Sequence, residues 1–361
     1  MNRRLSGLTL ALVALVTLGA CELPVGRNSQ QMGYRGVGMW NVSNTRIDAK
    51  KAAANALPAA IPAVAADSSD PGYVNVQVLG HLNKAEFLRS MTAITAWVSP
   101  KQGCLYCHYV DKSTGTINYA SDSLYTKVVA RRMIQMTQKV NSEYKGHVAN
   151  TGVACWTCHR GNAVPANIWF FTDKYQVLRH YLDRQDFRVQ SQAALPADAN
   201  NRSSIKQTEY AYGLMINMST ALGVNCTYCH NSRIWNSWEQ SSPKRIVALR
   251  GIRMVRDLNT NFLVSLTGVW PANRLGPLHG DAPKLQCATC HNGIYKPMYG
   301  QAMAKDYPFL YPAGAAPDGD ALSGVATSLP AQRNTTTAPV SAPAPTPAPA
   351  QSGASSTLSL R

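Results

Sequence analysis

The chain has 361 residues, with 35 lysines and arginines against 19 aspartates and glutamates, so its formal net charge is +16. That length is enough for one large domain or two modest ones. A basic chain first suggests nucleic-acid binding. Here the basic residues are scattered and the chain begins with an export signal, so we expect no nucleic-acid partner.

The first twenty residues predict a secretory signal peptide of the lipoprotein type. Two arginines precede the apolar run Leu8–Leu18, which is too short for a membrane span. The run ends in Leu-Gly-Ala before Cys21, which resembles a bacterial lipoprotein cleavage box. We therefore expect Cys21 to be the mature N-terminus and the lipid-attachment site. Ordinary cleavage with an unmodified thiol, or a retained N-terminal anchor, is the alternative.

Residues 21–72 are expected to form an extended N-terminal arm. Within it, Lys50–Asp67 is rich in alanine and contains Pro58 and Pro62. Such a composition favours an extended segment over a packed element.

Eight of the nine cysteines form four pairs of identical spacing, and each pair is followed at once by a histidine. The motifs are Cys104-Leu105-Tyr106-Cys107-His108, Cys155-Trp156-Thr157-Cys158-His159, Cys226-Thr227-Tyr228-Cys229-His230 and Cys287-Ala288-Thr289-Cys290-His291. C-x-x-C-H is the haem c attachment motif. Two thiols one helical turn apart can reach both vinyl groups of a porphyrin, and the histidine then lies under the iron.

Zinc binding and thiol–disulfide chemistry explain this pattern less well. Nothing in zinc coordination requires a histidine directly after each pair, and a thioredoxin-like protein would carry one such motif in a βαβ pattern. The sequence therefore predicts four covalently bound haem c groups, with the eight motif cysteines as thioether ligands.

The sixth iron ligand decides what such a haem does, and three methionines are candidates. Met91 lies seventeen residues before the first motif histidine, Met133 twenty-six before the second and Met215 fifteen before the third. Each lies on a stretch with helical apolar spacing, and Asn83 with Glu86 predicts the N-cap of the first such helix. A single methionine is usually core filler, but the place of each one before a motif favours ligation.

An internal repeat divides the chain into two similar parts. Val128–Met136 aligns with Ile246–Met254, and the match continues from Val140-Asn141 to Leu258-Asn259. We therefore expect a mainly α fold with much irregular structure, in which two helix–haem–helix–haem halves are related by a pseudo-two-fold axis. The first half should span residues 73–185, a connector residues 186–202 and the second half residues 203–311.

The repeat breaks at one position. Gly251 stands where the first half has Met133, and glycine cannot ligate iron. The fourth haem then needs another ligand or has an open site. The candidates are Met254, His279 and a histidine of the other half, notably His147.

These motifs and offsets resemble the tetrahaem cytochrome subunit of the purple-bacterial photosynthetic reaction centre. Similar stretches are Phe87–Cys107, Val128–Met133, His147–Gly161, Gly251–Asn259 and Lys305–Pro308, and the lipid-attachment cysteine is also similar. The resemblance covers roughly residues 34–310.

The resemblance implies a set of axial ligands. The pairs are Met91 with His108, Met133 with His159, Met215 with His230, and His147 with His291. The last pair crosses between halves, in agreement with what Gly251 requires. Met136, Met218 and Met254 are then core residues, and His81, His180 and His279 structural or surface residues.

The resemblance also implies an electron carrier rather than an enzyme. A soluble periplasmic donor, either a high-potential iron–sulfur protein or a cytochrome c2, would reduce it. It would in turn rereduce the photooxidised special pair, while bound to the core subunits and lipid-anchored on the periplasmic face of the photosynthetic inner membrane. The alternatives are a multihaem reductase or oxidase with one open iron, and a generic membrane-anchored electron-transfer cytochrome.

The last fifty residues should not fold. Residues 312–361 form a tail, of which Ala331–Arg361 is rich in proline, alanine, threonine and serine. With almost no large apolar side chains, it cannot bury enough surface to offset its ordering entropy, so we expect disorder.

Overall fold

A computed structural model describes residues 26–33, 36–65, 67–70, 72–172, 176–179, 182 and 205–315. These residues all belong to one compact unit that spans residues 1–323. The predicted signal peptide, Cys21, His180, the connector and almost all of the tail lie outside the described residues. None of the described helices is both long enough and apolar enough to cross a bilayer.

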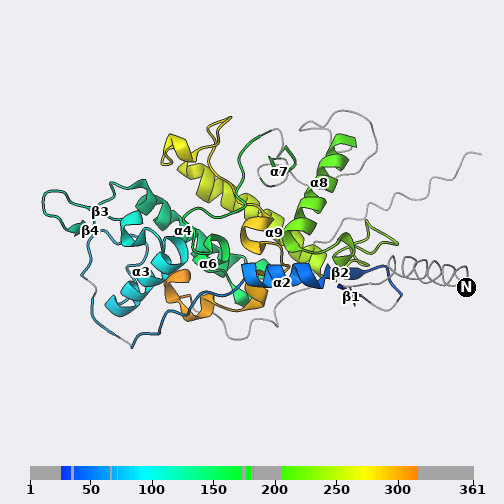
Figure 1. Ribbon diagram of the computed structural model, residues 1–361, viewed down its shortest axis with the longest axis horizontal. Helices are drawn as coiled ribbons and strands as arrows, with labels where there is room; N and C mark the ends of the chain where they lie inside the picture. Colours follow the sequence, from blue (N-terminus) through cyan, green and yellow to red (C-terminus); the bar gives the residue numbers. More distant parts are fainter. Residues whose placement is uncertain are drawn as a thin grey trace, which may run out of the picture. The chain divides into compact units, whose positions relative to one another are not determined.

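The described fold consists mainly of helices joined by irregular segments, which confirms the predicted class in this respect (Figure 1). The α-helices are α2 (Thr45–Ala54), α3 (Lys84–Val98), α4 (Tyr125–Glu143), α5 (Lys145–Val148), α6 (Cys155–His159), α7 (Gln176–Arg179), α8 (Ile205–Leu222), α9 (Lys244–Leu258) and α10 (Cys287–His291). A π-helical turn, Asn259–Leu263, continues α9.

The strands form two short antiparallel pairs. β1 (Arg27–Gln31) pairs with β2 (Trp40–Asn44), and β3 (Tyr109–Val110) pairs with β4 (Ile117–Asn118). Within the expected extended arm, residues 27–31 and 40–44 are therefore paired strands, and helix α2 follows them. Asn44 caps α2 by accepting hydrogen bonds from the amides of Arg46 and Ile47. Residues 56–65, with Pro58 and Pro62, have neither helix nor strand, as expected.

The helix start that Asn83 and Glu86 predict is present in the structure. The side chain of Asn83 accepts a hydrogen bond from the amide of Glu86 at 2.9 Å and so caps α3. Helix α9 buries one face, which carries Leu249, Ile252 and Val255.

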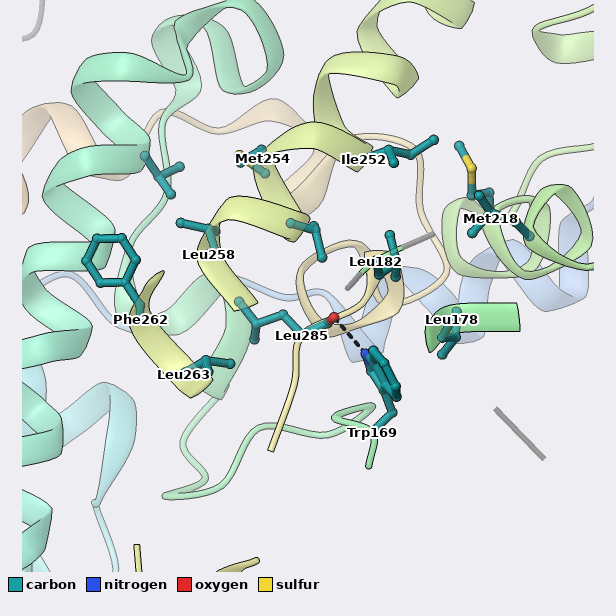
Figure 2. Packing of buried hydrophobic residues seen from close by; sticks show 13 residues of the cluster. Trp169, Leu178, Leu182, Met218, Ile252, Met254, Leu258, Phe262, Leu263 and Leu285 are labelled. Atoms are coloured by element: carbon teal, nitrogen blue, oxygen red, sulfur yellow. Dashed lines mark hydrogen bonds between the residues drawn. The ribbon is translucent and has the colours of Figure 1, made fainter. Parts of the chain in front are cut away.

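Two hydrophobic cores hold these helices together. Core A contains residues of α4, α8 and α9 together with Trp169, whose indole donates to the carbonyl oxygen of Leu285 at 2.8 Å (Figure 2). Core B joins α3 to the segment 304–311. The fully buried Trp97 of α3 packs edge-on against Tyr307 of this segment. Helix α4 fixes this segment, since Gln138 donates to the carbonyl oxygen of Phe309 at 3.0 Å. The end of the predicted second half thus packs on helices of the first.

Candidate haem sites

The four C-x-x-C-H motifs adopt two local conformations. The second and fourth motifs are the short α-helices α6 and α10. The first and third motifs begin in 3-10 turns, Gly103–Tyr106 and Cys226–Tyr228. In both turns the amide of the motif histidine donates to the carbonyl oxygen of the first cysteine at 3.0 Å. None of the eight motif cysteines, all within the described residues, forms a disulfide, so their thiols are available for thioether bonds.

A threonine hydroxyl caps both α6 and α10 in the same way. Thr157 accepts from the amide of Ala154, and Thr289 accepts from the amide of Gln286, each at 3.0 Å. The residue after each motif histidine, Arg160 or Asn292, then leaves the helix in the left-handed conformation.

Each of these two helices is also attached to the preceding long helix by a buried asparagine. The side chain of Asn141 accepts from the amide of Val153 at 2.7 Å and donates to its carbonyl oxygen at 2.9 Å. Asn259 does the same with Leu285, at 2.7 and 3.0 Å. Val153 and Leu285 both lie two residues before the first cysteine of a motif. The internal repeat aligns the two asparagines, but the sequence alone did not assign them this role.

Three motif histidines are oriented by backbone carbonyls. Their Nδ1 atoms lie 2.9–3.0 Å from the carbonyl oxygens of Asn162 (for His159), Trp235 (for His230) and Ile294 (for His291). A carbonyl only accepts, so Nδ1 carries the proton and Nε2 keeps its lone pair for a metal.

Burial keeps these imidazoles neutral, as a metal ligand must be. It lowers the pKa of His159 and His230, and with the nearby His147 it lowers the pKa of His291 to about 4. His108 differs in that its buried Nδ1 finds no hydrogen-bond partner among the described residues. Burial lowers the pKa of His108, and the nearby backbone of Tyr119 opposes this shift.

An apolar cavity of about 360 Å³ lies at the second motif. Cys155, Cys158 and His159 of α6 line it, and Met133 of α4 lines it as well. The cavity extends to Cys107 and Cys290 of two other motifs and to Met136 and Met254. At the second motif itself, two thiols, an imidazole and the thioether of Met133 together make the donor set of a Met/His haem c. The residues present therefore fit the haem that the motif implies.

The other two candidate methionines also lie on helices that pack against a motif. Met91 is half-buried on α3, which contacts the turn of the first motif, and Met215 is half-buried on α8, which contacts the turn of the third. In contrast, Met218 and Met254 are buried in core A, as predicted for core residues (Figure 2). Met136 is partly buried and packs against the same core.

Of the described candidates for the fourth motif, His147 is the one whose ring lies next to the motif histidine, although Met254 lines the same cavity as Cys290. The ring centres of His147 and His291 are 6.0 Å apart. At this separation the two imidazoles could hold one metal ion between them. His279 and His81 are exposed instead. The Nδ1 atom of His147 lies 2.9 Å from the carbonyl oxygen of Val247 and so leaves Nε2 free.

The second and fourth motifs lie side by side. The Sγ atoms of Cys158 and Cys290 are 2.8 Å apart, and helices α6 and α10 contact each other. Arg160 connects them, since its guanidinium donates to the carbonyl oxygen of Cys290 at 2.9 Å and to Asn55 at 3.2 Å. No motif in the sequence indicated this arginine.

The N-terminal hairpin and α2 contact the third and fourth motifs. Thr227, inside the third motif, donates to the carbonyl oxygen of Trp40 at 2.7 Å. Asn55 donates to the carbonyl oxygen of Asn292, directly after the fourth motif, at 3.2 Å. This segment is thus part of the motif surroundings, which its composition did not indicate.

Comparison with known proteins gives the family. Residues 22–177 and 171–311 match the family described as photosynthetic reaction centre cytochrome C subunit. The chain belongs to this family. It is 46% identical over 345 residues to the photosynthetic reaction center cytochrome c subunit of Rubrivivax gelatinosus, which covers 87% of this chain and 91% of that protein. It is 44% identical over 347 residues to the subunit of the same name from Thermochromatium tepidum, which covers 86% of this chain and 83% of that protein.

More distant relatives carry similar descriptions. The subunit of the same name from Roseobacter denitrificans is 38% identical over 334 residues, 82% of this chain and 88% of that protein. Cytochrome c-554 of Chloroflexus aurantiacus is 27% identical over 220 residues, about half of each chain. The chain is therefore a c-type cytochrome that carries electrons, as predicted, and not an enzyme.

Proposed function

We propose that this chain passes electrons from a soluble periplasmic carrier, through four covalently bound haem c groups, to the photooxidised special pair of a reaction centre. The observation that carries the proposal is the repeated site: each C-x-x-C-H motif has a ligand-bearing side chain near it or on a helix packed against it. When bound, haem iron supplies the reversible one-electron step, and the protein sets its potential through ligands and burial.

We further propose the ligand set that the sequence predicts. Cysteines 104, 107, 155, 158, 226, 229, 287 and 290 hold the porphyrins by thioether bonds. Met91/His108, Met133/His159, Met215/His230 and His147/His291 are the axial pairs. A helix–motif contact supports the first and third pairs, a common cavity the second and a ring contact the fourth. The hydrogen bonds between Nδ1 and a backbone carbonyl support four of the five histidines.

The two-half organisation belongs to the same proposal, with dihaem halves at residues 73–185 and 203–311. It is supported by the matching conformations of the first and third motifs and of the second and fourth. The equivalent asparagine contacts, at Asn141 and Asn259, support it independently because they join equivalent helices to equivalent motif positions.

We place the mature chain on the periplasmic face of the photosynthetic membrane, held by a lipid on Cys21 and by the reaction-centre core subunits. The soluble donor follows from charge. A chain with a net positive charge attracts an acidic or weakly charged carrier, such as a high-potential iron–sulfur protein, and repels a basic cytochrome c2.

The haem content is tested by the mass of the purified chain and by a potentiometric titration, which should resolve four one-electron centres. The donor is tested by measuring haem reduction by each carrier as ionic strength rises. Reduction by a basic cytochrome c2 that slows strongly with added salt would contradict the donor assignment, because it would indicate attraction between the two proteins. We expect that added salt does not slow haem reduction by cytochrome c2, and that the iron–sulfur protein reduces the haems faster.

A further inference from the structure

The imidazole of His147 lies directly over a glycine of the neighbouring helix. A Cβ atom built on Gly251 of α9 would stand 2.5 Å from Cε1 of His147, 2.9 Å from Nδ1 and 3.0 Å from Nε2. Such distances are well inside van der Waals contact. Any side chain at position 251 must therefore displace the His147 ring or the helix that carries it.

The ring is held where it would meet that side chain. Its Nδ1–H donates to the carbonyl oxygen of Val247, one helical turn before Gly251, and its ring centre lies 6.0 Å from that of His291. Helix α5, which carries His147, also packs on α9.

Two further contacts fix α5 on α9. The hydroxyl of Tyr144 donates to Asp257 at 2.6 Å, and Arg250 donates to the carbonyl oxygen of Gly146 at 3.3 Å. The imidazole therefore cannot yield without loss of hydrogen bonds between the two helices.

The internal repeat makes the missing side chain informative. Met133 of α4 stands 118 residues before Gly251 (251 − 133). Counted back from the first cysteine of the motif, the counterpart of His147 is His279, because each lies eight residues before that cysteine (155 − 147 and 287 − 279). His279 is exposed, whereas His147 lies against Gly251 and close to His291. The half with glycine at this helix position therefore receives the histidine of the other half, and its own equivalent histidine is exposed.

We propose that Gly251 determines the axial ligand of the fourth haem. Because glycine has no side chain, it leaves the space that the His147 ring occupies. It also provides no methionine, unlike α4 at the equivalent position. The inference rests on the ligand set given under Proposed function. A methionine in place of histidine raises the potential of a His-ligated haem, so residue 251 selects between a lower and a higher potential at this site.

The test compares Gly251→Ala and Gly251→Met in the full-length haem-loaded protein with a matched control, Gly268→Ala. A Cβ at Gly268 meets no atom within 4 Å, and its backbone is not in the left-handed region. Potentiometric titration and the spectroscopic signatures of bis-histidine and methionine–iron ligation are the readouts. Alanine is the better helix former, so any loss at position 251 comes from the displaced ring.

In Gly251→Ala we expect one haem to lose its bis-histidine signature and shift in potential, while the other three and the control stay unchanged. In Gly251→Met that haem should gain a methionine–iron signature and a raised potential. If Gly251→Met does not accumulate with haem, the double variant Gly251→Met/His147→Ala decides, because it frees the space that the ring occupied. No gain of methionine ligation in the double variant would overturn the proposal.

A single variant, His147→Ala, separates this inference from the function on which it rests. If His147→Ala leaves all four haems unchanged, His147 is not a ligand and the proposed ligand set is wrong. If it alters one haem while Gly251→Ala alters none, the ligand set stands and only the role of Gly251 is refuted.

Discussion

The clearest energetic prediction concerns Asn259, the fully buried asparagine that joins α9 to the fourth motif. In Asn259→Ala, the amide of Leu285 loses its only acceptor among the described residues, and the carbonyl oxygen of Leu182 loses a donor at 3.1 Å. The carbonyl oxygen of Leu285 keeps the bond from the indole of Trp169.

The magnitude follows from these groups. A buried polar group left without a partner costs about 1–3 kcal/mol, so two such groups would cost about 2–6 kcal/mol in a rigid structure. Relaxation around the new alanine reduces this, and we expect a loss of about 2–4 kcal/mol. Asn141→Ala should behave alike, since it removes the acceptor of the Val153 amide and donors to the carbonyl oxygens of Val153 and Leu310.

The assay is urea unfolding of the haem-loaded chain, followed by far-ultraviolet circular dichroism and by the haem absorbance. Asn261→Ala is the control, because Asn261 is exposed and, within the described part of the chain, its side chain bonds only to Asp257. It should change the unfolding free energy by less than about 0.5 kcal/mol. If Asn259→Ala is as mild as Asn261→Ala, the buried contact does not hold the motif and the reasoning is refuted.

Three further predictions concern ligation, charge and anchoring. Met133→Leu should lower the potential of one haem and leave the other three nearly unmoved in a titration; a shift of all four would show that Met133 is not an individual ligand. Asp122→Asn removes a carboxylate whose pKa the Arg131 guanidinium at 2.8 Å holds well below its usual range. A carboxyl group with a depressed pKa stabilises the fold at pH values above its ordinary pKa, and this stabilisation is lost as the pH falls through the folded-state pKa. The variant should therefore lose about 0.5–1 kcal/mol of unfolding free energy at neutral pH and match wild type in strong acid. Unfolding at several pH values measures this difference. Cys21→Ser should prevent lipid attachment, so that metabolic labelling with a fatty acid, present in wild type, is absent; equal labelling of both proteins would exclude Cys21 as the acceptor.

Much of the fold and site could be predicted because the information is local. Short-range spacing identified the motifs, and a cap such as Asn83 with an apolar stripe identified the helices. The break at Gly251 even indicated that the fourth motif needs a ligand from elsewhere. The motifs and helices depend on residues within a few turns of one another, and the break at Gly251 was visible because the two repeats can be aligned.

What the sequence did not reveal depends on contacts between distant segments. The N-terminal hairpin is held in place by a hydrogen bond from the hydroxyl of Thr227 to the carbonyl oxygen of Trp40, 187 residues away. The alignment paired Asn141 with Asn259, but only the packed structure shows that both bind the backbone before a motif. Likewise, glycine at 251 was recognised as unable to ligate iron, but its use as a seat for His147 requires the docking of α5 on α9.

The most direct test of the donor role is flash-induced absorbance change in the haem α-band, measured in native membranes poised so that the haems begin reduced. We expect rapid haem oxidation after the flash, with a time course that matches rereduction of the special pair. Haems that stay reduced after the flash, while the special pair is rereduced by another route, would contradict it.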